Sequence, residues 1–473
     1  NLLLLLQIYC KKIMSSIFHK NIEVMRLLAF TTFFLLSFIN YFNIDASIFL
    51  YLLFIFASFL CLKKIFNLQN SFGFTMILTL TFLGFWFKFS IITIFFDSHY
   101  GEGIGFFDFS RGEVNNVLVL CAIFKLSLLF SNYIFKKFNI KKYKVSLKNI
   151  EILLFKRLLL FISLILIFVL FVCYVNFANK IYVRTFEFNQ NYIFFTNVFK
   201  LFFKILAPLL IYFSLDLIFK FNQNNKKSFF IIFILIFVLN MIYVSQLSRE
   251  AGIHILIIIY SFLLLKEKNL TKDVKKFYGI LIISYIIWFV VSLYSIQYLR
   301  AQITMVLAEP VTDTINYIKV INNNNISLLV NRWVGVDAVM AIVSYNEKDW
   351  GLLSDISNNQ INWTTTVAWP MTDYFQNKVH VNTPGPAAFL YSSGSFIFFS
   401  FFSFILFLFF FILEAFITLI NKNFLLASNF LIFILAYRIM HIGLGINNFI
   451  YFVLSILIVV VFLIIVNQLL KFK

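Results

Sequence analysis

The chain has 473 residues, of which 62% are hydrophobic and 12% are charged, and its mean hydropathy is +0.92. This composition excludes a soluble multidomain protein and is typical of a polytopic membrane protein. The formal net charge of +19 comes mostly from lysines at the ends of apolar runs, so we exclude nucleic acid as a partner. The four cysteines form no C-x-x-C motif, and we expect no zinc site and no disulfide framework.

Twelve apolar segments of roughly spanning length follow one another along the chain. They predict an all-α polytopic membrane protein with about twelve transmembrane helices. In chain order, the expected spans are 26–40, 46–62, 72–96, 114–134, 152–175, 192–219, 229–247, 252–265, 277–295, 387–420, 424–437 and 448–470. The chain then divides into an N-terminal cytoplasmic segment (1–25), nine transmembrane helices (26–296), one large outer loop (297–386) and three final transmembrane helices (387–473).

The connections between these segments alternate in charge. Lysine groups at 63–64, 136–148, 220–227, 266–276 and 422 fall on one side, together with the lysines of both chain ends. By the positive-inside rule this side is cytoplasmic, so both termini are expected to be cytoplasmic and the large loop periplasmic.

The large loop, 297–386, differs in composition from the rest of the chain. It contains four of the six tryptophans, four of the five prolines and seven of the twenty acidic residues. None of its apolar runs is long enough to span a bilayer. We therefore expect a folded extramembrane loop with short helices, at 311–321 and 338–345, where the apolar residues have helical spacing.

Arginine is distributed differently from lysine. Six of the eight arginines lie on the expected outer side, although lysine is the more common cation. A guanidinium group pairs bidentately with phosphate or carboxylate, so the outer face is predicted to bind an anion at the membrane surface. The arginines assigned to this site are Arg249, Arg300, Arg332 and Arg438. The alternative is that each arginine only forms an ion pair with a nearby acid.

Three titratable residues on the outer side are candidates for accepting a proton from a sugar hydroxyl. Asp337 is the first choice, followed by His441 and Glu250. His441 lies three residues after Arg438, so one face of a helical turn carries both side chains. His254, inside an apolar run, is expected to be a core histidine.

Trp333, Tyr374 and Asp373 are the candidates for contact with sugar. Aromatic rings stack on sugar faces, but they equally form the core of a loop or an interfacial belt. Asp373 alternatively caps a helix or stands in a turn. Both interpretations stay open at this point.

The layout of the chain resembles the Wzy-type O-antigen polymerases, the enzymes that polymerise oligosaccharide repeat units. In residues, the resemblance rests on 249–252, Arg300, 332–337 and the return to the membrane at 384–395. It implies a GT-C-like glycosyltransferase architecture in the bacterial inner membrane. It also implies a reaction at the outer face, in which a glycan on undecaprenyl pyrophosphate is transferred to a repeat unit on the same lipid. The arginines would bind the pyrophosphate, and no metal or other cofactor is implied.

The partners implied by the resemblance are the lipid-linked glycan donor, the lipid-linked acceptor and membrane lipid. A chain-length regulator protein is a further partner that it leaves open. Two alternatives remain, an O-antigen ligase and a flippase or transporter of lipid-linked oligosaccharides. Lysines in or near the spans favour the transporter, namely Lys88, Lys125, Lys156, Lys200 and Lys204. The large loop counts against it.

Overall fold

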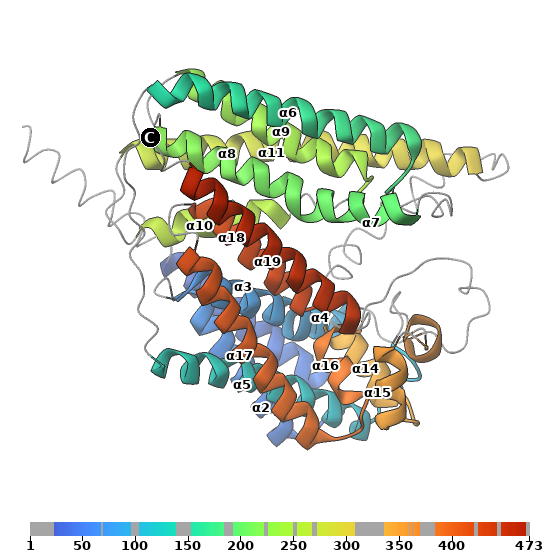
Figure 1. Ribbon diagram of the computed structural model, residues 1–473. Helices are drawn as coiled ribbons and strands as arrows, with labels where there is room; N and C mark the ends of the chain where they lie inside the picture. Colours follow the sequence, from blue (N-terminus) through green and yellow to red (C-terminus); the bar gives the residue numbers. More distant parts are fainter. Residues whose placement is uncertain are drawn as a thin grey trace, which may run out of the picture.

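The computed structural model describes residues 23–67, 70–95, 104–138, 153–183, 193–221, 226–248, 253–266, 272–307, 335–358, 360–361, 363–368, 384–420, 424–441 and 446–469. Every regular element in these residues is a helix, which confirms the all-α class (Figure 1). Long apolar stretches form helices because all backbone groups then bond within the segment.

The elements follow in three runs. The first contains helix Glu23–Phe42, α2 (Ile48–Ile65), α3 (Phe72–Thr81), the π-helical turn η1 (Phe82–Phe87), α4 (Lys88–Phe95) and α5 (Arg111–Lys137). The second contains α6 (Leu153–Asn179), α7 (Ile193–Leu201), the π-helical turn η3 (Phe202–Leu206), α8 (Ala207–Phe221), α9 (Lys226–Ser245), α10 (Ile253–Lys266) and α11 (Lys272–Leu307). The third contains α14 (Val336–Ser344), α15 (Trp350–Ser357), η5 (Thr364–Ala368), α16 (Gly385–Tyr391), α17 (Phe396–Ile420), α18 (Leu425–Ile439) and α19 (Ile446–Leu469).

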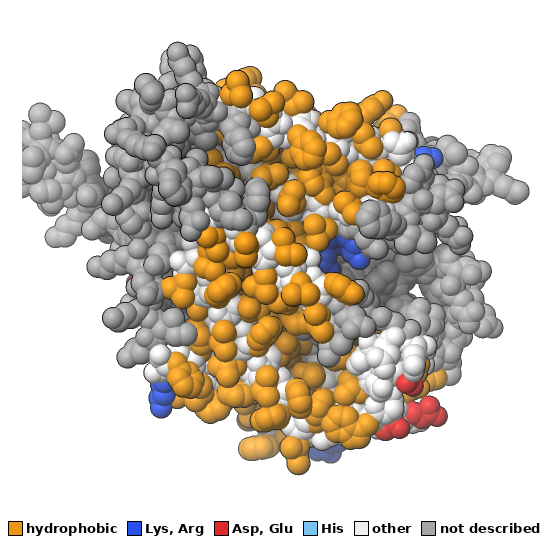
Figure 2. All heavy atoms as spheres, in the orientation of Figure 1, with side chains coloured by type: hydrophobic (Ala, Val, Ile, Leu, Met, Phe, Trp, Pro, Cys, Tyr) orange, Lys and Arg blue, Asp and Glu red, His pale blue; other side chains and the backbone are white. Residues whose placement is uncertain are grey.

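Each of the twelve predicted apolar segments lies on one or more of these helices. Among the described residues, eight helices are long and apolar enough to cross a membrane, and three more apolar helices are shorter. Figure 2 shows hydrophobic side chains over most of the described part of one face. The protein is therefore a polytopic helical membrane protein, while the total of twelve spans and their sidedness stay predictions.

The helices form two groups that α18 connects (Figure 1). In one group, α2, α3 and α17 contact α5. In the other group, α6, α8 and α11 contact α9. Helix α18 contacts α3 and α17 of the first group and α8 of the second, and it also contacts α10. Helix α18 therefore lies between the two groups.

Two buried carboxylates cap helices that begin inside the protein. Asp216 of α8 accepts hydrogen bonds from the backbone N–H groups of Leu426 at 3.0 Å and Ala427 at 2.9 Å, in the first turn of α18. Glu414 of α17 accepts one from the N–H of Gly73 at 2.7 Å, in the first turn of α3. These N–H groups have no partner within their own helix, and a carboxylate also stabilises the positive end of the helix dipole.

The described part of the large loop packs against the spans. All nine residues of α14 are buried, and α14 contacts α5 and α16. The predicted helix at 338–345 is confirmed with a slightly earlier start, whereas 311–321 lies outside the described residues. Figure 1 shows α14, α15 and α16 together at one end of the bundle, the end at which α7 also lies.

The tenth predicted segment, 387–420, is wrong as a single helix. The structure divides it into α16 and α17, with a turn between them at which Gly394 has φ +70°. A Cβ at Gly394 would lie 2.8 Å from the carbonyl oxygen of Lys348, so this turn also needs a close backbone approach. Helix α17 alone, at 25 residues, is long enough to span.

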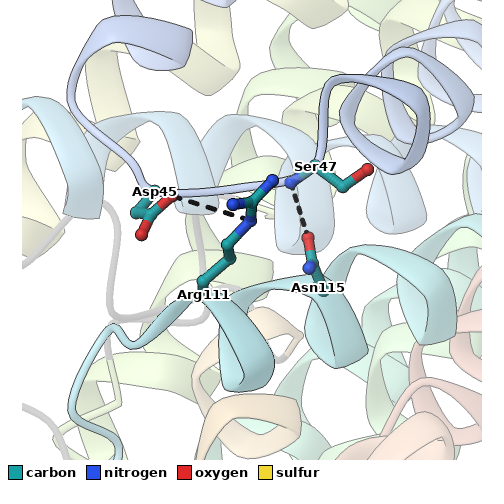
Figure 3. A network of polar contacts seen from close by, with 4 residues as sticks. All are labelled: Asp45, Ser47, Arg111 and Asn115. Atoms are coloured by element: carbon teal, nitrogen blue, oxygen red, sulfur yellow. Dashed lines mark hydrogen bonds and ion pairs between the residues drawn. The ribbon is translucent and has the colours of Figure 1, made fainter.

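The N-terminal ends of α2 and α5 are held together, next to the 104–110 segment that precedes α5. The backbone N–H of Ser47 donates to Asn115 Oδ1 at 2.8 Å, and Arg111 Nε lies 3.9 Å from Asp45 Oδ1 (Figure 3). Both charged side chains are well exposed, at 64% and 73%. Arg111 therefore follows the alternative interpretation of the outer arginines, an ion pair with a nearby acid.

Candidate anion-binding site

A small pocket lies where α9 ends, α10 begins and α18 ends. It has a volume of about 50 Å³ and is lined by Lys204, Tyr243, His254, Phe430, Phe433, Ile434, Tyr437 and Arg438. This volume is enough for several water molecules or for a phosphate group. The pocket combines an aromatic wall with two cations, and the cations give it a composition suited to an anionic group.

A third cation lies beside these two. Lys200, at the end of α7, is close enough to Arg438 for the two like charges to repel each other. Lys200 and Lys204 are four residues apart on a continuous helical stretch, and like charges at this spacing cost about 0.2–0.5 kcal/mol. Figure 2 shows Lys and Arg side chains among hydrophobic ones near the middle of that face. An anion bound among the three cations would offset this repulsion.

The guanidinium group of Arg438 is oriented by an aromatic ring. Its Cζ lies 5.2 Å from the ring centroid of Phe452 in α19, within cation–π range. A guanidinium group that stacks on a ring keeps its in-plane N–H donors for other partners. Arg438 is therefore held by α19 in a way that leaves its fork suited to an oxyanion.

His441 follows Arg438 at the end of α18, as the sequence predicted. Its Nδ1 lies 2.6 Å from the carbonyl oxygen of Tyr437, and its ring is 4.0 Å from the Tyr437 ring. A carbonyl oxygen only accepts, so Nδ1 carries the proton in this bond and Nε2 is the basic nitrogen of the neutral ring. His441 is therefore held against Tyr437, whose side chain lines the pocket.

Asp337 lies in a different environment. Its carboxylate oxygen Oδ1 is 2.9 Å from Lys88 Nζ, and both side chains are only 1% exposed. Lys88 begins α4, directly after the π-helical turn η1, whose Gly84 lies against Gly335 at the start of α14. The ion pair therefore joins the loop helix to the third predicted span, and the carboxylate would meet a substrate only if this contact opened.

Arg300 is on α11, but its side chain is outside the described part of the structure. The other predicted residues lie outside the described ranges altogether: Arg249, Glu250, Arg332, Trp333, Asp373 and Tyr374. Of the four arginines, the structure therefore places the side chain of Arg438, and the backbone N–H of His441 donates to the Arg438 carbonyl oxygen at 3.0 Å.

Two loop tryptophans that are described pack against protein. The Trp350 ring is 4.6 Å from the Phe398 ring of α17, and Trp363 is 4% exposed. Trp363 is therefore buried, as in the alternative interpretation in which the loop aromatics form the core of the loop, whereas Trp350 is 58% exposed.

The pocket also contains residues that sequence reasoning set aside. Lys204 was interpreted from the sequence as a transporter feature and His254 as a core residue; Lys200, which lies near Arg438 outside the pocket lining, was interpreted in the same way as Lys204. The sequence contains one signal for Lys200 and Lys204, which is their spacing of four residues within an apolar stretch. A pair of charges inside a span is costly and often functional. Comparison with protein-family models, with curated proteins and with solved structures finds no match for this chain.

Proposed function

We propose that the protein is a metal-independent glycosyltransferase that polymerises lipid-linked oligosaccharide repeat units at the outer face of the bacterial inner membrane. One observation carries the proposal: Lys204 and Arg438 line a pocket among apolar helices, and Lys200 lies near enough to Arg438 to add a third positive charge. A diphosphate on a polyprenyl lipid matches both features, because its charge suits the cations and its tail suits the surrounding apolar surface.

The reaction uses the pocket to hold the leaving group. A hydroxyl oxygen of the acceptor repeat unit attacks the anomeric carbon of the donor glycan, and the bond from that carbon to the diphosphate oxygen breaks. The electron pair of that bond remains on the diphosphate, where Arg438 and the two lysines stabilise the added negative charge. The proton of the hydroxyl passes to Nε2 of His441, the basic nitrogen of its neutral ring.

The glycans need a larger surface than the pocket, whose volume is about 50 Å³. In this proposal both glycans extend toward the end of the bundle at which α14, α15 and α16 lie (Figure 1). The large loop that contains these helices supplies the surface against which the glycans bind. In this arrangement the lipid, the diphosphate and the glycan of each substrate follow one another along the bundle axis.

A lipid-linked oligosaccharide flippase is the second candidate, favoured by lysines buried within the helices. The structure gives two of them fixed partners, which weakens this candidate. Lys88 pairs with Asp337, and Lys125 Nζ donates to Ser58 Oγ at 2.7 Å. A lysine that moves a substrate would be expected to line a path, whereas Lys125 is fully buried between α2 and α5.

The test is the chain-length ladder of the surface glycan in cells that depend on this protein. We expect Arg438→Ala and Arg438→Lys each to lower polymerisation by about 10²–10³-fold, leaving single repeats, because lysine does not reproduce the bidentate fork. Arg111→Ala is the matched control, since Arg111 is exposed and pairs only with Asp45 in the described surroundings. Full ladders from both Arg438 variants would remove the proposal. Loss of all glycan from the acceptor, single repeats included, would favour the ligase or the flippase.

A further inference from the structure

His254 lies at a junction of four helices on the wall of the pocket. It is the second residue of α10, and it contacts Tyr212 of α8, Tyr243 of α9 and Phe430 of α18. The imidazole is 4% exposed, and the ring of Phe430 stacks on it with centroids 5.8 Å apart and planes 20° apart. This packing fixes the plane of the imidazole and hence the direction in which both ring nitrogens point.

Each ring nitrogen of His254 meets a tyrosine hydroxyl. Nδ1 lies 2.9 Å from the hydroxyl oxygen of Tyr212, and Nε2 is hydrogen-bonded to the hydroxyl of Tyr243. Tyr212 is fully buried, whereas Tyr243 lines the pocket together with Lys204 and Arg438. The chain of hydrogen bonds therefore runs from the protein interior to the pocket wall.

The direction of this chain is limited by hydrogen-bond chemistry. A neutral imidazole has one N–H donor and one acceptor nitrogen, so one tyrosine donates to His254 while the other accepts from it. If Tyr212 donates to Nδ1, then Nε2–H donates to the Tyr243 oxygen, and the O–H of Tyr243 turns toward the pocket. An anion in the pocket favours this direction, because it accepts the O–H and the reverse direction would aim an oxygen lone pair at it.

We propose that Tyr243 is a hydrogen-bond donor to the bound phosphate and that His254 is the positioning residue that directs it. This inference rests on the proposed function, because it assigns a further ligand to the same diphosphate site. Tyr243 adds a neutral donor to the charges of Lys200, Lys204 and Arg438. Together with the fork of Arg438 it fixes the orientation of the phosphate, whereas the two lysines contribute charge.

The experiment measures binding of two probes to the full-length protein purified in detergent, inorganic pyrophosphate and farnesyl diphosphate. We expect Tyr243→Phe to weaken both about tenfold or more, the value of one hydrogen bond to a charged group. His254→Leu should weaken both by a similar factor, and the double variant should bind no more weakly than either single variant. His254→Gln should restore most of the loss, because its amide N–H can replace Nε2–H. Tyr51→Phe is the control, since it removes a buried hydroxyl, bonded to the Ser37 carbonyl, in the other group of helices.

The results of these binding measurements distinguish the role of Tyr243 and His254 from the proposed function itself. If wild-type protein binds neither probe, both proposals fall. If Arg438→Ala weakens binding but Tyr243→Phe does not, the anion site stands and the role of Tyr243 is overturned. If the losses of His254→Leu and Tyr243→Phe multiply in the double variant, His254 acts through general packing and the positioning role is overturned. Should His254→Leu fail to fold, Tyr243→Phe and His254→Gln still decide the question.

Discussion

The ion pair between Lys88 and Asp337 gives the most quantitative prediction about how the large loop is held. Lys88 Nζ and Asp337 Oδ1 are 2.9 Å apart, and both side chains are 1% exposed. If one of the two side chains is removed, the charge of the other therefore stays out of contact with water. Removing one member of such a pair costs about 3–5 kcal/mol, because the other charge stays buried. Replacing both members with apolar residues of similar size is often neutral or stabilising.

The perturbation is a double-mutant cycle of Lys88→Met, Asp337→Leu and the combined variant. We expect each single variant to lose about 3–5 kcal/mol of unfolding free energy and the double variant to recover most of that loss. The assay is reversible unfolding of the purified protein in mixed detergent micelles, followed by tryptophan fluorescence. The four loop tryptophans make the signal sensitive to whether the loop is docked.

The matched control is the exposed pair of Asp45 and Arg111, which is 3.9 Å apart. A cycle with Asp45→Ala and Arg111→Ala should show a coupling of about 1 kcal/mol or less, because water screens both charges. Additive losses in the Lys88 and Asp337 cycle would refute the reasoning, since they would mean that the two charges do not depend on each other. A coupling as small as that of the control pair would refute it equally.

Two further predictions concern close backbone contacts and helix caps. Gly335→Ala should destabilise the protein by about 1–3 kcal/mol, because a Cβ at Gly335 would lie 2.1 Å from the Gly84 carbonyl oxygen. Gly112→Ala is the control and should not destabilise it, since Gly112 has open space around it. Equal unfolding midpoints for the two variants would contradict this close approach. Asp216→Ala should lower the free energy of unfolding by about 1–3 kcal/mol, because it leaves the N–H groups of Leu426 and Ala427 buried without an acceptor. Amide hydrogen exchange in the first turn of α18 should then become faster. Unchanged exchange there would show that the cap is dispensable.

The spans were predictable from the sequence because each depends on a local property. A run of apolar residues of sufficient length forms a helix in a membrane whatever its neighbours are. For example, the predicted span 114–134 lies within α5, and 152–175 corresponds to α6. The break before Phe396 has a local signal in the Ser-Ser-Gly-Ser stretch at 392–395, but the sequence does not show that Gly394 approaches the distant Lys348.

The site was predictable only in the part that is local in sequence. Arg438 and His441 share one turn, and their spacing alone indicates that they lie together. The pairing of Lys88 with Asp337 joins residues far apart in the chain, and no spacing rule predicts which buried charge meets which. His254 reads as a core histidine in sequence, and it is indeed buried, but only packing shows that one of its faces meets the pocket.

The proposed polymerisation is tested most directly by reconstitution. The purified protein is placed in liposomes with a polyprenyl-diphosphate-linked repeat unit and no other protein, and both the glycan length and the released polyprenyl diphosphate are measured. We predict that glycan chains lengthen and that one polyprenyl diphosphate is released for each repeat added, with both signals lost in Arg438→Ala. Intact wild-type protein that moves the lipid-linked repeat across the bilayer but releases no polyprenyl diphosphate would contradict the proposal.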